Sequence, residues 1–325
     1  MTRIKKPIKI LTIIMTLTAT IQSNAQTWPD RPVRIVNPFA AGAASDVVAR
    51  LIAEKLTRKL DKSFVVDNRP GANAIIGTEI VSKAAPDGYT VLSGGNTTHA
   101  ANPSLYQSIP YDPIKDFSPV AFIVGLHYYL VVSPNFPGNN VKDLVNYAKS
   151  NPEKITYGTG NATSTISAEL FNLTTGTQFA QVSYKGNPLA ITDVISGNLT
   201  TMFLDNSTAR GLIQAGKLKA LGIAALNRSE IFPDIATLTE SGVPGINLTA
   251  WIALWFPAKT PQYIVQKMNT EVNAARALPD VTHKLKELGF TLEGSGPSVQ
   301  QFTEFIKSEI ALWARVVKEA KIVKQ

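Results

Sequence analysis

A turn of small residues near the start of the chain has the composition of an anion-binding site. It follows the apolar stretch 33–39, which predicts a buried strand, and precedes residues 46–60, whose apolar spacing predicts a helix. Small residues let the backbone approach a ligand, and free amides with the helix dipole favour a negative group such as a carboxylate. Tight packing of the helix on the strand is the structural alternative. The candidate ligand-binding residues of this turn are Phe39, Gly42, Ala43, Ala44, Ser45 and Asp46.

A second turn of the same kind spans residues 158–165, between a predicted strand and a predicted helix. Hydroxyl groups here add to the backbone donors. One such turn in each half of the chain would place two anion-binding helix termini across a cleft, which suits a small molecule with two acidic or polar ends. Its candidate ligand-binding residues are Asn161, Thr163, Ser164 and Thr165.

Three further residues are candidates on the same side of the cleft. Asp205 ends a predicted strand and would accept a hydrogen bond from a ligand amine or a protonated acid; alternatively, it caps the next helix. Tyr184 and Lys185 are secondary candidates, and for Lys185 plain solvent exposure is an equal alternative.

The composition argues against catalysis by thiols, metals or nucleotides. The chain has no cysteine, and His99, His127 and His283 are far apart and outside any zinc-binding motif. Residues 211–218 match a phosphate loop only as far as its lysine, since Leu218 stands where the magnesium-binding hydroxyl belongs. We expect no metal, no cofactor and no enzymatic activity. A secreted hydrolase or isomerase using Asp205 with Tyr184 or His99 is the enzymatic alternative.

The N-terminus predicts export. Residues 1–25 contain four basic residues, a short apolar stretch and a final Ser-Asn-Ala, the layout of a cleavable signal peptide. Without them the chain has 28 basic and 24 acidic residues, a net charge of +4, and no basic stripe. We therefore expect a periplasmic protein that binds no nucleic acid.

The order of the elements predicts an α/β protein with two lobes. Strands and helices alternate along the chain, and apolar runs at 120–132 and 248–256 bracket the middle series. The first run predicts either two strands or one strand crossing between lobes. We assign residues 26–126 to the first part of lobe 1, 127–249 to lobe 2, and 250–325 to the second part of lobe 1, its C-terminal helices.

Long stretches of the sequence resemble one known family. They are WPDRPVRIVNPFAAGAASDVVARLIAEKL, VVDNRPGANAIIGTEIVSKAAPDGYTVL, IPYDPIKDFSPVA, VSYKGNPLAITDVISGNLTTMF, IQAGKLKALGI and FPDIATLTESGVPG. They resemble the Bug family, the TctC-like periplasmic substrate-binding proteins of tripartite tricarboxylate transporters. The resemblance extends from Trp28 to Ile322, essentially the whole mature chain.

The resemblance implies a type II periplasmic binding protein, with two α/β lobes joined by two crossing segments and a cleft between them. It implies a receptor for a small carboxylate (a dicarboxylate, aromatic acid or acidic amino acid), held partly through water by the turn at 39–46. The turn at 160–165 would take the distal group, with Asp205 in the same cleft. The partners would be membrane permease subunits, and we expect a monomer; a ligand sensor that signals through a membrane kinase is the alternative.

Two positions depart from the family pattern. Ala43 follows Gly42 where the family usually has a second glycine, and the second-lobe turn lacks the usual histidine, being one residue short. These departures imply an altered distal subsite, so the usual ligand does not carry over.

Overall fold

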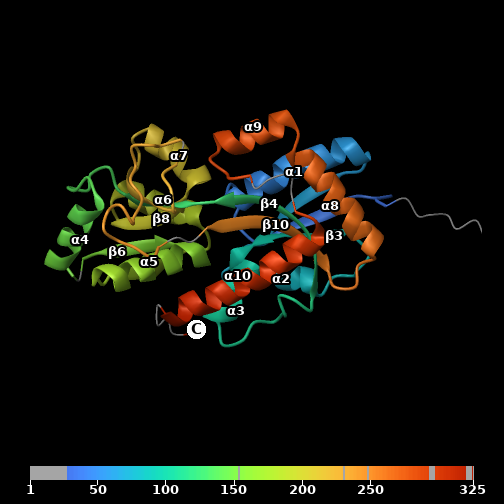
Figure 1. Ribbon diagram of the computed structural model, residues 1–325, viewed down its shortest axis with the longest axis horizontal. Coiled ribbons are helices and arrows are strands. Elements are labelled where there is room, and N and C mark those ends of the chain that lie inside the picture. Colours follow the sequence, from blue (N-terminus) through green and yellow to red (C-terminus); the bar gives the residue numbers. More distant parts are fainter. Residues whose placement is uncertain are drawn as a thin grey trace, which may run out of the picture.

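The structure is a computed structural model that describes residues 28–152, 154–229, 231–246, 249–292, 297–319 and Lys324. The predicted signal peptide, residues 1–25, lies outside the described residues. Within them the chain forms two α/β lobes side by side (Figure 1), as the resemblance implied. None of the described helices has both the length and the apolar character that a membrane span requires.

The first lobe is built on a five-stranded mixed sheet. Its strands are β1 (Val33–Asn37), β2 (Phe64–Asn68), β3 (Thr90–Gly95), β4 (Phe117–Leu126) and β10 (Ala250–Pro257). The strand order is β2-β1-β3-β10-β4; β1 is parallel to β2 and β3, and β10 is antiparallel to β3 and β4. Val33, Ile35 and Val36 of β1 are fully buried, as expected for a strand covered on both faces.

The second lobe repeats this arrangement. Its strands are β5 (Tyr128–Val132), β6 (Thr156–Thr159), β7 (Ala180–Ser183), β8 (Thr201–Asp205) and β9 (Lys219–Ala224). They lie in the order β7-β6-β8-β5-β9, with β6 parallel to β7 and β8, and β5 antiparallel to β8 and β9. In each lobe, therefore, three parallel strands direct their carboxyl ends toward one edge of the sheet.

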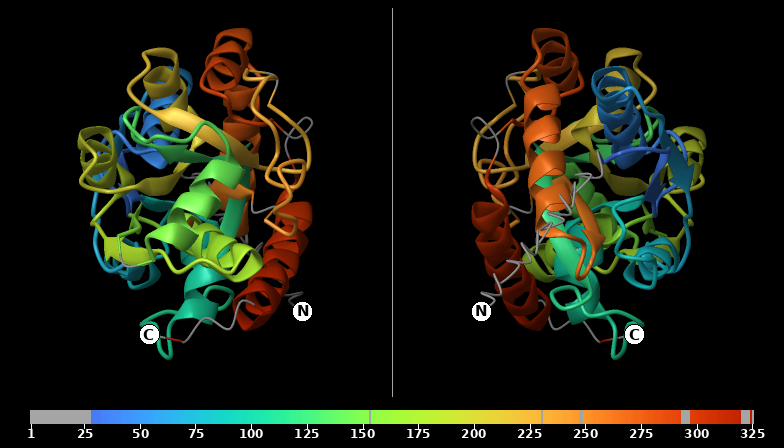
Figure 2. Two further views of the ribbon diagram at one scale, coloured as in Figure 1. Left: turned by 90° about the vertical axis from the view of Figure 1, so that its left-hand side faces the viewer. Right: turned by 90° about the vertical axis from the view of Figure 1, so that its right-hand side faces the viewer.

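Helices cover the sheets, and the C-terminal helices return to the first lobe. The first lobe has α1 (Ala44–Leu60), α2 (Ile75–Ser82), a short π-helix η1 (Thr97–Ala101), α3 (Asn102–Leu105), α8 (Gln262–Arg276), α9 (Pro279–Glu287) and α10 (Val299–Glu319). The second lobe has α4 (Val141–Ser150), α5 (Ala162–Thr175), α6 (Asn187–Ser196) and α7 (Asn206–Gln214). Helix α8 packs against β4 and α1, whereas α10 packs against β4, α3 and η1 and lies along one flank (Figure 2).

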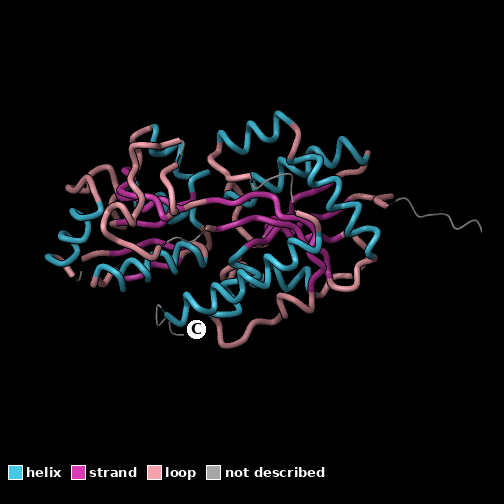
Figure 3. Tube along the Cα trace, in the orientation of Figure 1, coloured by secondary structure: helices cyan, strands magenta, loops and turns pink. Residues whose placement is uncertain are grey.

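The long apolar run at 120–132 is two strands, one of the two alternatives that the sequence left open. β4 ends at Leu126 and β5 begins at Tyr128, so His127 alone separates the two sheets. The strands continue from one lobe into the other as a central layer with helices around it (Figure 3). The connection is short and can act as a hinge.

The second apolar run, residues 248–256, was expected to cross between the lobes, and the strand within it does not cross. Within it, β10 begins at Ala250, opposite Leu126, and pairs only with β3 and β4 of the first sheet. The strand does not itself cross, because its hydrogen-bonding partners end where β4 passes into β5. The segment 225–249, of which Glu230, Asn247 and Leu248 lie outside the described residues, contains no named helix or strand in its described part and makes the second connection.

Two helices begin earlier than the sequence pattern predicts. Helix α1 begins at Ala44 with Ala43 as its N-cap, so Ser45 and Asp46, the expected caps, lie inside the first turn. Helix α5 begins at Ala162 instead of Thr165 because the side chain of Asn161 accepts a hydrogen bond from Ser164 N. Both changes move predicted ligand-binding residues from a loop into a helix.

Candidate functional site

A small inner pocket lies between the two sheets, with a volume of about 60 Å³. Turns after five strands form its wall, at Phe39, Ala40 and Ala43–Ser45, at Gly94–Thr97, at Gly160 and Asn161, at Gly186 and Asn187, and at Asp205 and Thr208. The strands that join the lobes contribute Leu126, Tyr128 and 250–252. Each turn leads into a helix, so the N-termini of α1, η1, α5, α6 and α7 converge on one pocket.

The positive potential of the inner pocket comes from the backbone. Among the described residues that line it, Asp205 alone carries a charged side chain. Helix N-termini carry partial positive charge and free N–H groups, so they stabilise an anion without lysine or arginine. The hydroxyl of Ser45 is buried and has no hydrogen-bond partner among the described residues. These features suit a carboxylate.

The predicted residues of the first turn divide into two groups. Phe39, Ala43, Ala44 and Ser45 line the inner pocket. Asp46 instead holds the turn: its carboxylate accepts hydrogen bonds from Gly42 N at 3.0 Å, Arg50 Nε at 3.0 Å and Asn68 Nδ2 at 2.9 Å. Burial alone would raise the pKa of Asp46, but these hydrogen bonds and the charge of Arg50 lower it below its ordinary value. Neither Gly42 nor Asp46 lines a described cavity.

The predicted residues of the second turn also divide. Asn161 lines the inner pocket, whereas Thr163 and Ser164 are fully buried in α5. Ser164 Oγ donates to Phe203 O at 2.8 Å, and Thr163 Oγ1 accepts from Asn96 Nδ2 at 2.5 Å. These two hydroxyls therefore serve protein contacts and line no described cavity.

Asp205 caps helix α7, the structural alternative that the sequence offered for it. Its carboxylate accepts hydrogen bonds from Thr208 N at 3.0 Å and Ser207 Oγ at 2.6 Å. The residue also lines the inner pocket beside Tyr128. Burial, and after it the charge of Asp205, raise the pKa of Tyr128 far above its ordinary range. The Tyr128 hydroxyl stays protonated and donates to Asn161 Oδ1 at 3.3 Å.

The two lobes touch around the inner pocket. Asn96 of the first lobe donates to Thr163 of the second, and its Oδ1 accepts from Trp251 N at 3.3 Å. At another place on the wall, a Cβ built on Gly186 of the second lobe would lie 3.1 Å from Ala40 Cβ of the first. Groups from both lobes thus meet around the pocket.

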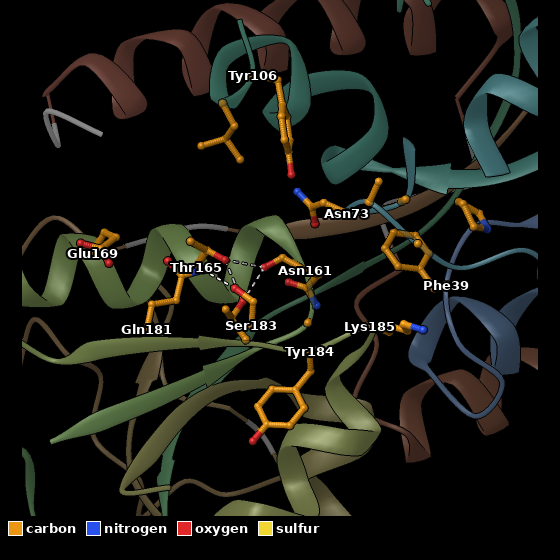
Figure 4. Close-up of a pocket in the computed structure, with 17 residues that line it drawn as sticks. Phe39, Asn73, Tyr106, Asn161, Thr165, Glu169, Gln181, Ser183, Tyr184 and Lys185 are labelled. Carbon is orange, nitrogen blue, oxygen red and sulfur yellow. Dashed lines mark hydrogen bonds between the residues drawn. The ribbon is translucent and has the colours of Figure 1, made fainter. Parts of the chain in front are cut away.

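A larger cavity of about 630 Å³ adjoins the inner pocket and shares Phe39, Gly160 and Asn161 with it. We call it the outer chamber. Thr165, Tyr184 and Lys185 line it, and Figure 4 shows Tyr106, Asn73 and Phe39 on one side, with Asn161, Thr165 and Ser183 on the other. The hydroxyl of Tyr184 points away and donates to Asp193 Oδ2 at 2.5 Å, which raises the pKa of Tyr184.

The residues of the enzymatic alternative are engaged elsewhere. His99 is fully buried, stacks on Trp255 with ring centroids 3.9 Å apart, and has its pKa lowered by burial to about 3. Tyr184 is bonded to Asp193, and Asp205 to the start of α7. In the described ranges, no three His, Asp or Glu side chains gather as metal ligands.

Sequence reasoning missed two of the turns that line the inner pocket. They lie at Gly94–Thr97, where β3 ends and η1 begins, and at Gly186–Asn187, where α6 begins. Both have the signal used for the first two turns, small residues between a strand and a helix. A Cβ on Gly95 would lie 2.0 Å from Trp251 O, so only glycine allows β3 to approach β10 there.

Comparison with known proteins agrees with this architecture. Residues 48–322 match the tripartite tricarboxylate transporter family receptor. Three similar solved structures are the periplasmic binding protein BugD (31% identity, TM-score 0.88, 92% of this chain and 100% of that one), R. palustris Rpa4515 with adipate (34%, 0.88, 92% and 100%), and MatC of Rhodopseudomonas palustris with bound malate (31%, 0.85, 89% and 99%). The chain therefore belongs to the tripartite tricarboxylate transporter receptor family, the Bug or TctC-like periplasmic binding proteins that its sequence motifs resemble.

Proposed function

We propose that this protein is a periplasmic receptor that captures a small carboxylate in the inner pocket and delivers it to the permease subunits of a tripartite tricarboxylate transporter. Residues 1–25 direct its export and are then cleaved off, and the mature protein acts as a monomer and catalyses no reaction. The lobes are residues 26–126 with 250–325, and residues 127–249. They close on the ligand by rotation about His127 and the segment 225–249.

The convergence of five helix N-termini on the inner pocket carries this proposal. A carboxylate that leaves water loses strong hydrogen bonds, and oriented N–H groups replace them. The adipate and malate bound by two similar proteins support an acid as the ligand class.

Ala43 offers a direct test, because it is the N-cap of α1 and lines the inner pocket. Aspartate and asparagine are both good N-cap residues, so Ala43→Asp and Ala43→Asn should both fold and stabilise α1. They differ in charge alone. We expect Ala43→Asp to bind any carboxylate at least tenfold more weakly than Ala43→Asn does.

The measurement is a thermal-shift screen of the refolded mature protein against mono-, di- and tricarboxylates, acidic amino acids and aromatic acids, followed by calorimetry. A ligand at a hundred times its Kd should stabilise the folded state by about 2.7 kcal/mol. The neutral diamide of the best diacid should give no shift. If no acid shifts the melting temperature, or if the diamide binds equally well, the carboxylate proposal fails.

A further inference from the structure

A third cavity, of about 490 Å³, lies behind the connection between the two lobes. We call it the rear cavity. Successive side chains of an extended segment point to opposite sides. Accordingly, the inner pocket is lined by Leu126, Tyr128, Asp205 and Ala250, whereas the rear cavity is lined by their neighbours in the chain, His127, Asn206 and Thr249. The inner pocket and the rear cavity therefore lie on opposite faces of the hinge.

Gly289 brings the first lobe to the rear cavity. It follows helix α9, and two residues later Thr291 exchanges two backbone hydrogen bonds with Gly125 of β4, each of 2.9 Å. Gly125 stands two residues before His127. Gly289 is thus fixed to the first lobe immediately beside the hinge and moves with that lobe.

Asn206 brings the second lobe to the same place. It is the first residue of α7, it is 4% exposed, and its backbone N–H donates to His127 O at 3.0 Å. Its side-chain Nδ2 donates to Gly289 O, across the lobes, while its Oδ1 has no partner among the described residues. The one described hydrogen bond of this buried side-chain amide is therefore a contact between the lobes.

Ile231 makes a second contact from the second lobe. The next residue, Phe232, packs edge-on against Tyr129 of β5 with ring centroids 5.8 Å apart, which ties this part of the chain to the second sheet. A Cβ built on Gly289 would lie 3.0 Å from Ile231 Cδ1 and 3.1 Å from Asn206 Nδ2. Both distances are shorter than an ordinary van der Waals contact, so a side chain at position 289 would push the second lobe away. We call Gly289 with Asn206 and Ile231 the rear contact.

The rear contact lies on the side of the hinge that narrows when the cleft opens. A rotation about the connection that separates Asn96 from Thr163 at the inner pocket brings the parts behind the connection together. Because the lobes already touch at Gly289, they have little room for that approach.

We infer that the rear contact is a stop that limits how far the cleft opens. Gly289, Asn206 and Ile231 thereby raise the affinity for the ligand without touching it, because the apparent affinity follows the fraction of the protein that is ready to bind. The limit on opening is independent of the proposed function, whereas the effect on affinity rests on it.

The opening can be measured without a ligand, because the chain has no cysteine of its own. Val47→Cys and Leu189→Cys would carry one nitroxide label each. Both positions are exposed, line none of the described cavities, and lie in the first turns of α1 and α6, one helix from each lobe. Double electron–electron resonance then gives the distribution of distances between the lobes.

Two variants should move this distribution in opposite directions. Gly289→Ala adds a methyl group to the rear contact and should shift the ligand-free protein toward shorter distances. Ile231→Ala removes side-chain atoms from the contact and should shift it toward longer ones. Gly176→Ala is the matched control for the first variant, because Gly176 also has a positive φ after a helix (66° against 84°) but no described atom within 4 Å of its Cβ. Ile114→Ala, at an exposed isoleucine outside the described cavities, is the control for the second, and neither control should change the distances.

Calorimetric titration of the unlabelled variants with adipate and with malate should give the same order. We expect Gly289→Ala to bind about threefold more tightly and Ile231→Ala about threefold more weakly, while both controls stay within about twofold. A purely structural role of the rear contact would lower the melting temperature of both variants and would not tighten binding.

The possible failures are distinguishable. If the distances in Gly289→Ala and Ile231→Ala match those of their controls, or shift in the same direction as each other, the inference is wrong whatever the protein binds. If Gly289→Ala does not fold, Ile231→Ala decides the question alone. If the distances shift as expected but neither adipate, malate nor any other carboxylate binds, the proposed function fails and the limit on opening stands.

Discussion

Asn96 Nδ2 donates a hydrogen bond to Thr163 Oγ1 across the lobes, at 2.5 Å, and both residues are buried. Asn96 begins the turn into η1 of the first lobe, and Thr163 lies in the first turn of α5 in the second. The same Asn96 side chain accepts from Trp251 N on β10. The side-chain amide of Asn96 thus joins α5 of the second lobe to β10, the strand that pairs with β4 next to the connection between the lobes.

Removing the acceptor of this bond should favour the open state. Thr163→Val keeps the shape of the side chain and leaves the Asn96 amide without a partner only when the lobes are closed. A buried donor without a partner costs about 1–3 kcal/mol, so the affinity for the ligand should fall roughly fivefold or more. Small-angle scattering should show a more open free protein. Thr175→Val, in the last turn of the same helix, should leave both quantities unchanged.

The hydrogen bonds that Asp46 accepts from Gly42, Arg50 and Asn68 should make the stability of the protein depend on pH. The pKa of Asp46 is lowered from 3.8 in the folded state, so its stabilisation is present above pH 3.8 and is lost as the pH falls through the folded pKa. Asp46→Asn should lower the free energy of unfolding by about 1–3 kcal/mol at pH 7. Urea unfolding should show this deficit shrinking below pH 3.8. Asp61 is exposed, so Asp61→Asn should show neither effect. A loss of stability in Asp46→Asn that does not change with pH would contradict this role of the Asp46 carboxylate.

Close packing between two turns of the second lobe should make Gly160 intolerant of a side chain. A Cβ there would lie 2.2 Å from Gly186 C and 2.3 Å from Asn187 N, both backbone atoms. Gly160→Ala should destabilise the protein by about 1–3 kcal/mol and weaken ligand binding. Gly211→Ala, with nothing within 4 Å in helix α7, should instead stabilise it by about 0.5–1 kcal/mol. If Gly160→Ala and Gly211→Ala change the free energy of unfolding equally in denaturant titrations, this account is wrong.

His99 should contribute to unfolding in mild acid. Burial lowers its pKa from 6.5 to about 3, so between these values the unfolded chain binds a proton that the folded protein does not. Stability therefore falls as the pH drops from 6.5, by about 1.4 kcal/mol per pH unit from this residue. His99→Phe, which can still stack on Trp255, should flatten the dependence in this range, while His283→Gln on the surface should not. If the free energy of unfolding of His99→Phe falls with pH as steeply as that of the unchanged protein, His99 does not cause this pH dependence.

The sequence by itself determined the family, the α/β class and the two-lobed plan, because these depend on local patterns. Apolar periodicity predicts strands and helices, and small residues between them predict turns that can bind an anion. Both the turn at 39–46 and the turn at 158–165 were found in this way, and parts of both line the cleft.

Only the tertiary structure decided which side chains face the cleft. Asn161 caps α5 and thereby turns Thr163 and Ser164 into the protein, and Asp46 turns back to Gly42 and Arg50. The turns at 94–97 and 186–187, and Trp251 on β10, reach the inner pocket from distant parts of the chain. The physical reason is that a polar side chain takes whichever hydrogen-bonding partner the packed chain brings near it, and no local pattern specifies that partner.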